Sequence, residues 1–199
     1  MLKPPKFHRG FQRFAIPFVS LWLHLRFKLH IYGRENIPEG GCVVCPNHTA
    51  LTDPPLAAAA ISHRINLAVM AKKELFTGNQ FFARLITWLG AFPVSRDTAD
   101  ITAIKTALQA VKDGRKLIIF PQGTRGAGEG AAKEGAAMLA ARTKAPIVPM
   151  YITEDKKRFG RVDIIIGKPF LPPAGSRDYA AIAEDILHHI YALREGHAK

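Results

Sequence analysis

A histidine and an aspartate five residues apart are the side chains in this sequence best suited to proton transfer. His48 and Asp53 follow an apolar run predicted to be a strand, and they precede a predicted helix start. A carboxylate that accepts a hydrogen bond from the Nδ1–H of a histidine fixes the ring tautomer and leaves Nε2 as a base. The spacing therefore predicts a His–Asp dyad across a turn. The alternative is that Asp53 only caps the helix and His48 is an ordinary loop histidine.

Two further loops that follow predicted strands carry arginines. One loop spans residues 120–125 and includes Gly123, Thr124 and Arg125, and the other contains Arg96. Glycine, a hydroxyl and a planar guanidinium suit a phosphate or an oxyanion, because together they allow close backbone approach and offer several donors. The alternative for both loops is a solvated polar segment.

Strand and helix patterns alternate along the chain, as is typical of α/β proteins. We expect strands over residues 42–45, 65–70, 91–94, 116–120, 146–152 and 162–166, and helices over 53–61, 81–89, 101–112, 133–142 and 179–193. The predicted fold class is α/β, a layered domain with a mostly parallel (mixed) central sheet flanked by helices. In such sheets ligands gather beyond the carboxyl ends of the strands, where all three loops are expected to lie.

The composition excludes several classes of protein. With 199 residues, 48% of them hydrophobic and 22% charged, the chain is neither disordered nor of low complexity. Its two cysteines, Cys42 and Cys45, exclude a disulfide scaffold and a four-thiolate zinc site. On a strand they would point to opposite faces, which argues against a redox pair. Buried, reduced thiols suit a protein that faces the cytoplasm.

The net charge of +12 indicates an anionic partner. No acidic residue precedes Glu35, so the excess is concentrated at the start of the chain. The cations of this stretch are Lys3, Lys6, Arg9, Arg13, Arg26, Lys28 and Arg34.

An apolar stripe runs between these cations at helical spacing and consists of Phe7, Phe11, Phe14, Phe18, Leu21 and Leu25. The uncharged window between Arg13 and Arg26 has 12 residues, about 18 Å of helix, whereas a hydrocarbon core is roughly 30 Å thick. Pro17 is expected to divide the stretch into two helices. We expect residues 1–30 to dock, as amphipathic basic helices, on the cytoplasmic face of an anionic cell membrane, peripherally or as a monotopic segment. The alternative is that the stripe packs on the chain's own domain.

Four segments, in order, resemble the motifs of the glycerolipid acyltransferase family. They are Asn47–Asp53, with the family's His-four-residues-Asp pattern, Gly90–Arg96, Phe120–Arg125 and Ala145–Pro149. The spacers Lys72–Phe76 and Lys133–Ala136 also match, so the resemblance extends from about Tyr32 to Ile152. One departure is Gln122, an amide at the position where the third motif usually has glutamate.

The resemblance implies transfer of a fatty acyl group from acyl-coenzyme A or acyl carrier protein to the free hydroxyl of 1-acylglycerol-3-phosphate, a lysophosphatidic acid, giving phosphatidic acid. Residues 31–199 would form the acyltransferase domain. His48 would be the base, Asp53 would orient it, and Lys72 would face the oxyanion. The residues implied to bind the acceptor phosphate are Arg96, Gln122, Gly123, Thr124 and Arg125. The resemblance implies no metal and no cofactor besides the acyl donor. The acceptor could instead be another lysophospholipid or a lyso-aminolipid.

Two other classes of protein stay open. Residues 126–131 satisfy a dinucleotide-binding pattern, with Glu154 further on, but that pattern should begin directly after a strand. The net charge would also suit a nucleic-acid-binding protein. Phenylalanines at helical spacing among the cations favour lipid over a nucleic-acid partner.

Overall fold

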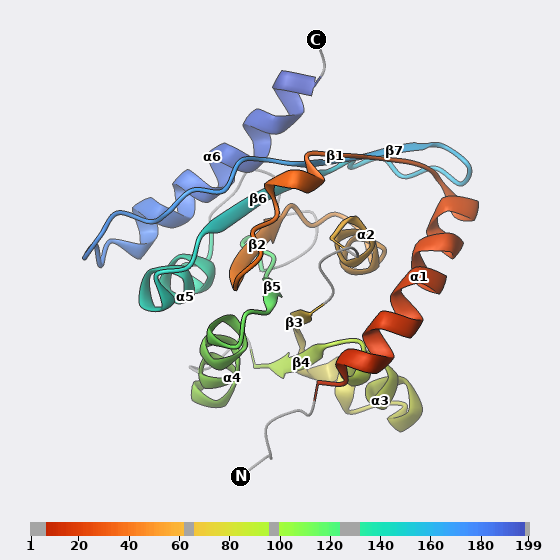
Figure 1. Cartoon of the computed structure of the whole chain (residues 1–199), viewed down its shortest axis with the longest axis horizontal. Helices are drawn as coiled ribbons and strands as arrows, with labels where there is room; N and C mark the ends of the chain where they lie inside the picture. Colours follow the sequence, from red (N-terminus) through yellow and green to blue (C-terminus); the bar gives the residue numbers. More distant parts are fainter. Residues whose placement is uncertain (1–6, 62–65, 96–99, 124–131, 198–199) are drawn as a thin grey trace.

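The computed structural model describes residues 7–61, 66–95, 100–123 and 132–197. At its centre is a seven-stranded sheet in the order β1-β7-β6-β2-β5-β3-β4 (Figure 1). The strands are β1 (Lys28–Tyr32), β2 (Cys42–Pro46), β3 (Leu67–Lys72), β4 (Ala91–Val94), β5 (Lys116–Ile118), β6 (Ile147–Ile152) and β7 (Arg161–Ile166). Every neighbouring pair is parallel except β6 and β7, so the predicted mostly parallel, mixed sheet is confirmed.

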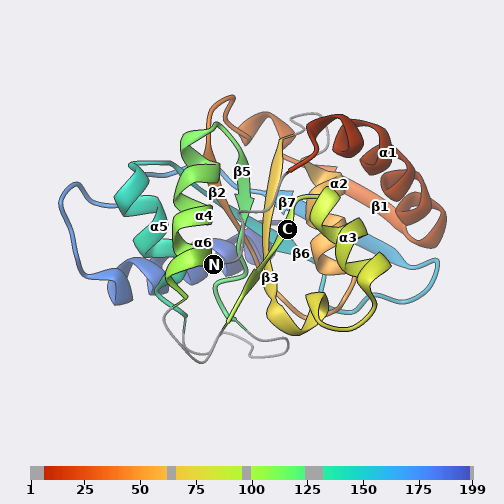
Figure 2. The ribbon, with the colours of Figure 1, turned by 90° about the horizontal axis from the view of Figure 1, so that it is seen from below.

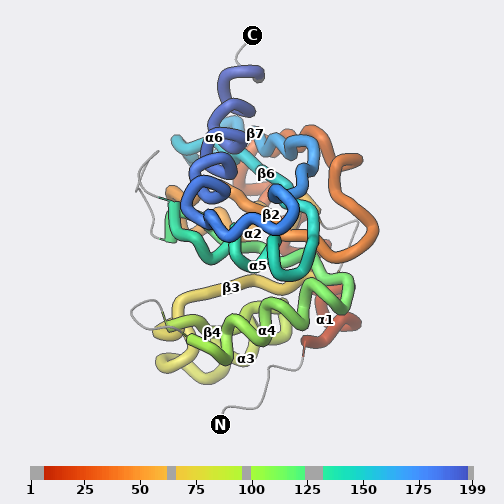
Figure 3. Tube along the Cα trace, turned by 90° about the vertical axis from the view of Figure 1, so that its left-hand side faces the viewer, coloured from red at the N-terminus to blue at the C-terminus, as the bar shows by residue number. Residues whose placement is uncertain are grey.

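Helices cover both faces of the sheet. The helices are α1 (Arg9–Arg26), α2 (Asp53–Ala60), α3 (Gln80–Trp88), α4 (Ile101–Lys112), α5 (Gly135–Thr143) and α6 (Tyr179–His197), with short 3₁₀ turns at Arg34–Asn36 and Lys73–Phe76. Helices α4, α5 and α6 lie on one face, and α1 and α2 lie on the other (Figures 2 and 3). Each layer closes its own apolar core against the sheet, because a sheet with helices on both sides buries both faces of its strands.

The two cysteines of β2 contact different cores, as the strand periodicity predicts. Cys45 packs under α4, α5 and α6, whereas Cys42 packs on the α1 and α2 side. Both thiols are free and buried, and burial raises the pKa of Cys42 to about 12. The thiols are therefore held protonated and act as small apolar side chains of the core.

The prediction of two helices around Pro17 is wrong. Helix α1 is continuous through that proline. Tertiary packing holds both halves: Ile16 and Leu23 are buried on either side of the proline. Gln12, also buried, donates from Nε2 to the carbonyl of Leu67 at 3.1 Å and accepts from the Leu67 N–H at 3.0 Å. These contacts outweigh the hydrogen bond that a proline removes from the helix interior.

Strand β1 was not expected from the sequence. It pairs in parallel with β7, Lys28 opposite Arg161, and forms one edge of the sheet. The boundary expected at residue 30 therefore falls inside a strand, and residues 28–30 belong to the sheet rather than to a docking helix. No helix in the described ranges is both long and apolar enough to cross a membrane.

Candidate active site

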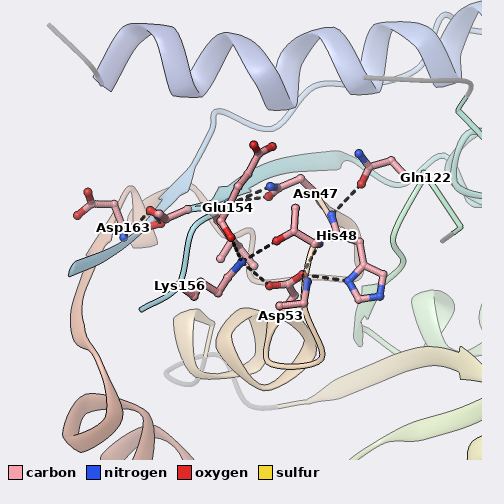
Figure 4. Close-up of polar contacts among 11 residues, drawn as sticks. Asn47, His48, Asp53, Gln122, Glu154, Lys156 and Asp163 are labelled. Carbon is pink, nitrogen blue, oxygen red and sulfur yellow. Dashed lines mark hydrogen bonds and ion pairs between the residues drawn. The ribbon is translucent and has the colours of Figure 1, made fainter. Parts of the chain in front are cut away.

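The site lies at the carboxyl end of β2, between β6 and β5, in the loop that leads to α2 (Figure 4). Asn47 fastens this loop to the end of β6. Its Nδ2 donates to the carbonyl of Ile152 at 2.9 Å, and its Oδ1 accepts from the Ile152 N–H at 2.7 Å. The amide thus continues the β2–β6 pairing by one residue. Two prolines in the first turn of α2 fix the other end of the loop.

His48 and Asp53 are in contact, as their spacing predicts. Nδ1 of His48 lies 3.0 Å from Oδ2 of Asp53, and the same oxygen accepts from the N–H groups of Thr49 at 2.6 Å and Ala50 at 2.7 Å. The N-cap of α2 is Thr52, and the Asp53 carboxylate turns back over the loop instead of capping the helix. The Nδ1–H of His48 donates a hydrogen bond to the carboxylate, so Nε2 is the nitrogen that can receive a proton.

Asp53 stays ionised although its side chain is completely buried. Burial alone would raise the pKa of this carboxyl, but hydrogen bonds from His48, the Ala50 N–H and Lys156, with the charge of Lys156, lower its pKa below the ordinary value. A negative charge beside Nδ1 stabilises an imidazolium that forms during proton transfer.

Gln122 supports the dyad from the loop after β5. Its Oε1 accepts from the backbone N–H of His48 at 2.7 Å, and its Nε2 donates to the hydroxyl of Tyr191 on α6 at 2.7 Å. The ring of Phe120 lies 4.2 Å from the imidazole, centre to centre. The amide of Gln122 thus joins three parts of the chain, and it serves both contacts without a charge.

Known proteins with similar sequences identify the family of this chain. A family model described as Acyltransferase matches residues 28–153. A Bacillus subtilis protein named 1-acyl-sn-glycerol-3-phosphate acyltransferase is 33% identical, and the match covers 79% of this chain and 81% of the relative. The chain belongs to the glycerolipid acyltransferase family. A Streptococcus pneumoniae protein of the same name is 36% identical over 70% of this chain and 54% of its own length.

A solved structure has the same fold as this acyltransferase. The crystal structure of the 1-acyl-sn-glycerophosphate (LPA) acyltransferase PlsC from Thermotoga maritima aligns with a TM-score of 0.70. The alignment covers 94% of this chain and 82% of that one at 22% sequence identity. At that identity the likeness supports the α/β architecture and carries no residue roles.

The structure does not gather every residue that the sequence singled out. Lys72, at the end of β3, is half-exposed, and its Nζ lies 3.4 Å from Oε1 of Glu74. Gly123 has φ +69°, a backbone conformation that residues with a side chain rarely adopt, so this turn of the acyltransferase favours glycine. Other predicted site residues, namely Arg96, Thr124, Arg125 and the 126–131 pattern, lie outside the described residues.

Sequence reasoning missed Lys156, which contacts the Asp53 carboxylate of this acyltransferase. It lies between β6 and β7, and its Nζ is 2.9 Å from Oδ1 of Asp53. The residue follows the last of the four family motifs, in a segment with no pattern that connects it to His48. No local spacing could have indicated the contact, because the two residues meet only through the pairing of β2 with β6.

Proposed function

We propose that this protein transfers a fatty acyl group from a thioester, acyl-coenzyme A or acyl carrier protein, to the free hydroxyl of 1-acylglycerol-3-phosphate, giving phosphatidic acid. The observation that carries the proposal is the buried His48–Asp53 dyad at the end of the central strand β2. The names of the Bacillus and Streptococcus relatives support this acceptor. Another lysophospholipid or a lyso-aminolipid would need the same dyad.

The proposed reaction needs no covalent enzyme intermediate. Nε2 of His48 removes the proton of the acceptor hydroxyl as its oxygen bonds to the thioester carbonyl carbon. The carbon–sulfur bond then breaks, and the leaving thiolate receives the proton from the imidazolium. Asp53 holds the ring in place and stabilises its charged form. We propose no metal and no cofactor besides the acyl donor.

Lys72 is proposed to face the oxyanion of the tetrahedral intermediate. Its strand β3 is parallel to β5, which is parallel to β2, so Lys72, the last residue of β3, and His48, which follows β2, lie toward the same edge of the sheet. The ion pair with Glu74 is largely exposed, and such pairs contribute only about 0–1 kcal/mol. Turning the ammonium toward the substrate therefore costs little.

The test of the reaction is an acylation assay with the purified protein in detergent. Labelled acyl-coenzyme A or acyl carrier protein would be offered with a panel of lysolipids, and the products separated. We expect labelled phosphatidic acid as the main product. A clear preference for another lysolipid would replace the proposed acceptor, and no product from any lysolipid with either donor would contradict the proposal.

Arg96 and Arg125, with Gly123 and Thr124 shaping the loop, are proposed to hold the acceptor phosphate. We expect Arg96→Ala and Arg125→Ala each to raise the KM for lysophosphatidate about 10-fold or more, because a charge-assisted contact to phosphate contributes about 1.5–3 kcal/mol. The KM for the thioester should change much less. Steady-state kinetics with each substrate varied measure both values. The exposed Arg142 on α5 provides a control variant, Arg142→Ala. An equal increase in the KM for lysophosphatidate and the KM for the thioester would contradict the assignment.

An apolar surface without a partner in the described chain is proposed to dock on the anionic cytoplasmic leaflet. Helix α1 turns Gln12, Ile16 and Leu23 inward. Its large apolar side chains that are more than half exposed are Phe14, Phe18, Leu21, Trp22 and Leu25. The stripe from Phe14 onward is therefore not packed on the chain's own domain.

Helix α3 extends this apolar surface. None of its residues is buried, and it exposes Phe81, Phe82 and Trp88. Trp88 packs edge-on against Phe11 of α1, with ring centres 5.3 Å apart, so the two helices are neighbours. Basic residues among exposed aromatic ones suit an anionic bilayer surface, where charge and apolar burial add.

Replacing Phe14, Phe18 and Trp22 together with serine is expected to weaken binding to vesicles that contain phosphatidylglycerol at least tenfold. Burying one large apolar side chain contributes about 1.5–3 kcal/mol. Co-sedimentation at low and high salt measures the binding. Leu171→Ser removes an exposed leucine far along the chain from α1 and α3 and should have little effect. Unchanged binding of the triple variant would contradict docking through α1. Deleting residues 1–30 is a poorer test, because it removes Gln12 and most of β1 from the fold.

A further inference from the structure

The ammonium group of Lys156 occupies the side of Asp53 that His48 leaves open (Figure 4). Lys156 Nζ lies 2.9 Å from Oδ1, whereas His48 contacts Oδ2, so the two carboxylate oxygens have different partners. The ammonium also donates to Oγ1 of Thr49 at 2.7 Å and lies 3.4 Å from the carbonyl oxygen of Glu154. Its side chain is only 4% exposed, and that of Asp53 is fully buried. Such an ion pair is screened little by solvent.

The other described groups around the imidazole are uncharged. The loop after β5 provides the Phe120 ring and the Gln122 amide, and the Nε2 of that amide donates to the Tyr191 hydroxyl of α6. The carboxylate of Glu154 points away from the dyad in Figure 4. In the part of the chain that the structure describes, Asp53 is the charged group in contact with His48, and Lys156 is the cation in contact with Asp53.

We propose that Lys156 is a positioning residue of the dyad, whose buried ammonium orients the Asp53 carboxylate and sets the lowest pH at which His48 can act as a base. This inference rests on the proposed function, in which Nε2 of His48 takes the hydroxyl proton. No spacing rule or motif places Lys156 in the site.

The effect of this ammonium on proton transfer has a definite sign. A cation 2.9 Å from the Asp53 carboxylate disfavours a proton on the His48–Asp53 pair, whichever of the two residues carries it. Without the ammonium the pair holds its first proton more tightly. A pair that already carries this proton cannot accept one from the acceptor hydroxyl. Lys156 thus extends the active pH range toward acid.

Lys156→Met keeps the length of the side chain and removes its charge. We expect the acid limb of the kcat/KM profile for lysophosphatidate to move up by about one pH unit. On the acid side kcat/KM should be about tenfold below the wild-type value, and it should return to that value as the pH rises. Lys156→Arg, which keeps the charge, should retain most of the acid limb.

Lys157→Met is the matched control, because it removes the same charge from the next residue. Lys157 is exposed and pairs with Asp155 at 3.3 Å. Its variant should keep the wild-type profile. An unchanged pH profile of kcat/KM for Lys156→Met would overturn the inference. A decrease in kcat/KM by the same factor at every pH would also overturn it.

A substrate-free measurement separates this inference from the proposed function. The ring signals of His48 can be followed by NMR as the pH changes, and their transition should move to higher pH in Lys156→Met than in the wild type. If it moves while no lysolipid is acylated by the wild type, the proposed function fails and the role of Lys156 stands. If it does not move, the inference fails whatever the acceptor.

Lys156→Met can also leave Asp53 as a buried charge without a counter-ion and so prevent folding. The double variant Asp53→Asn/Lys156→Met covers that case. Asp53→Asn alone leaves the buried ammonium of Lys156 without a counter-ion. Adding Lys156→Met removes that uncompensated charge and should therefore raise the urea midpoint of unfolding. If the second substitution lowers that midpoint instead, charge compensation between the two residues is refuted.

Discussion

Replacing His48 with alanine is expected to reduce acyl transfer about 10²–10⁴-fold, the usual contribution of a positioned general base. The acceptor hydroxyl must lose its proton as it attacks the thioester, and Nε2 of His48 is the group proposed to take it. The fold should survive, because the backbone N–H of residue 48 still donates to Gln122 and those of Thr49 and Ala50 still donate to Asp53.

Initial rates with labelled acyl-coenzyme A and lysophosphatidate measure this loss, and circular dichroism checks the fold. His188→Ala, on the exposed side of α6, is the matched control and should keep the wild-type rate. More than about a tenth of the wild-type rate remaining in His48→Ala would rule out the proposed base.

Asp53→Asn is expected to lower the rate by a similar factor, about 10²–10⁴-fold, for a different reason. An amide can present its NH₂ group to Nδ1 and so favour the wrong tautomer, and it does not stabilise an imidazolium. The KM for the thioester should change little, because the carboxylate is buried behind the histidine. The control is Asp163→Asn, which changes a carboxylate on β7 that pairs with Arg161 and should retain the wild-type rate.

Asp53→Asn should also reduce the free energy of unfolding by about 3 kcal/mol at neutral pH, because it leaves the buried Lys156 ammonium without its counter-ion. The pH dependence has a clear sign. The pKa of Asp53 is lowered on folding, so its stabilising contribution is present above the ordinary carboxyl pKa and is lost as pH falls through the folded value. Urea unfolding at several pH values should show this acid-side loss in the wild type and less of it in Asp53→Asn. Equal acid sensitivity in both proteins would mean that other carboxylates account for it.

Gln122 shows how the structure answers a question that the sequence raised. Gln122 is an amide at a position where the family usually has glutamate, so its contacts decide whether a neutral side chain can serve there. The amide oxygen receives the His48 N–H and the amide nitrogen reaches Tyr191. Both contacts are hydrogen bonds of ordinary length, so a neutral side chain can position the loop of the dyad.

Local patterns in the sequence were enough to predict the central features of this protein. Alternating apolar runs indicated the mostly parallel sheet, and strand periodicity placed Cys42 and Cys45 on opposite faces. The His48–Asp53 contact was also predictable, because it spans one short loop. All of these features depend on residues near one another in the chain, where the geometry of a strand or a turn limits the possible arrangements.

Only the tertiary structure decided which distant residues complete the site and which face of α1 is buried. Lys156 reaches Asp53 through the pairing of β2 with β6, and Gln122 reaches His48 through that of β2 with β5. Helix α1 continues through Pro17 because Gln12 and its buried neighbours bind the rest of the fold. Contacts between distant segments leave no periodic signal in the sequence, since their free energy arises only when the sheet brings those segments together.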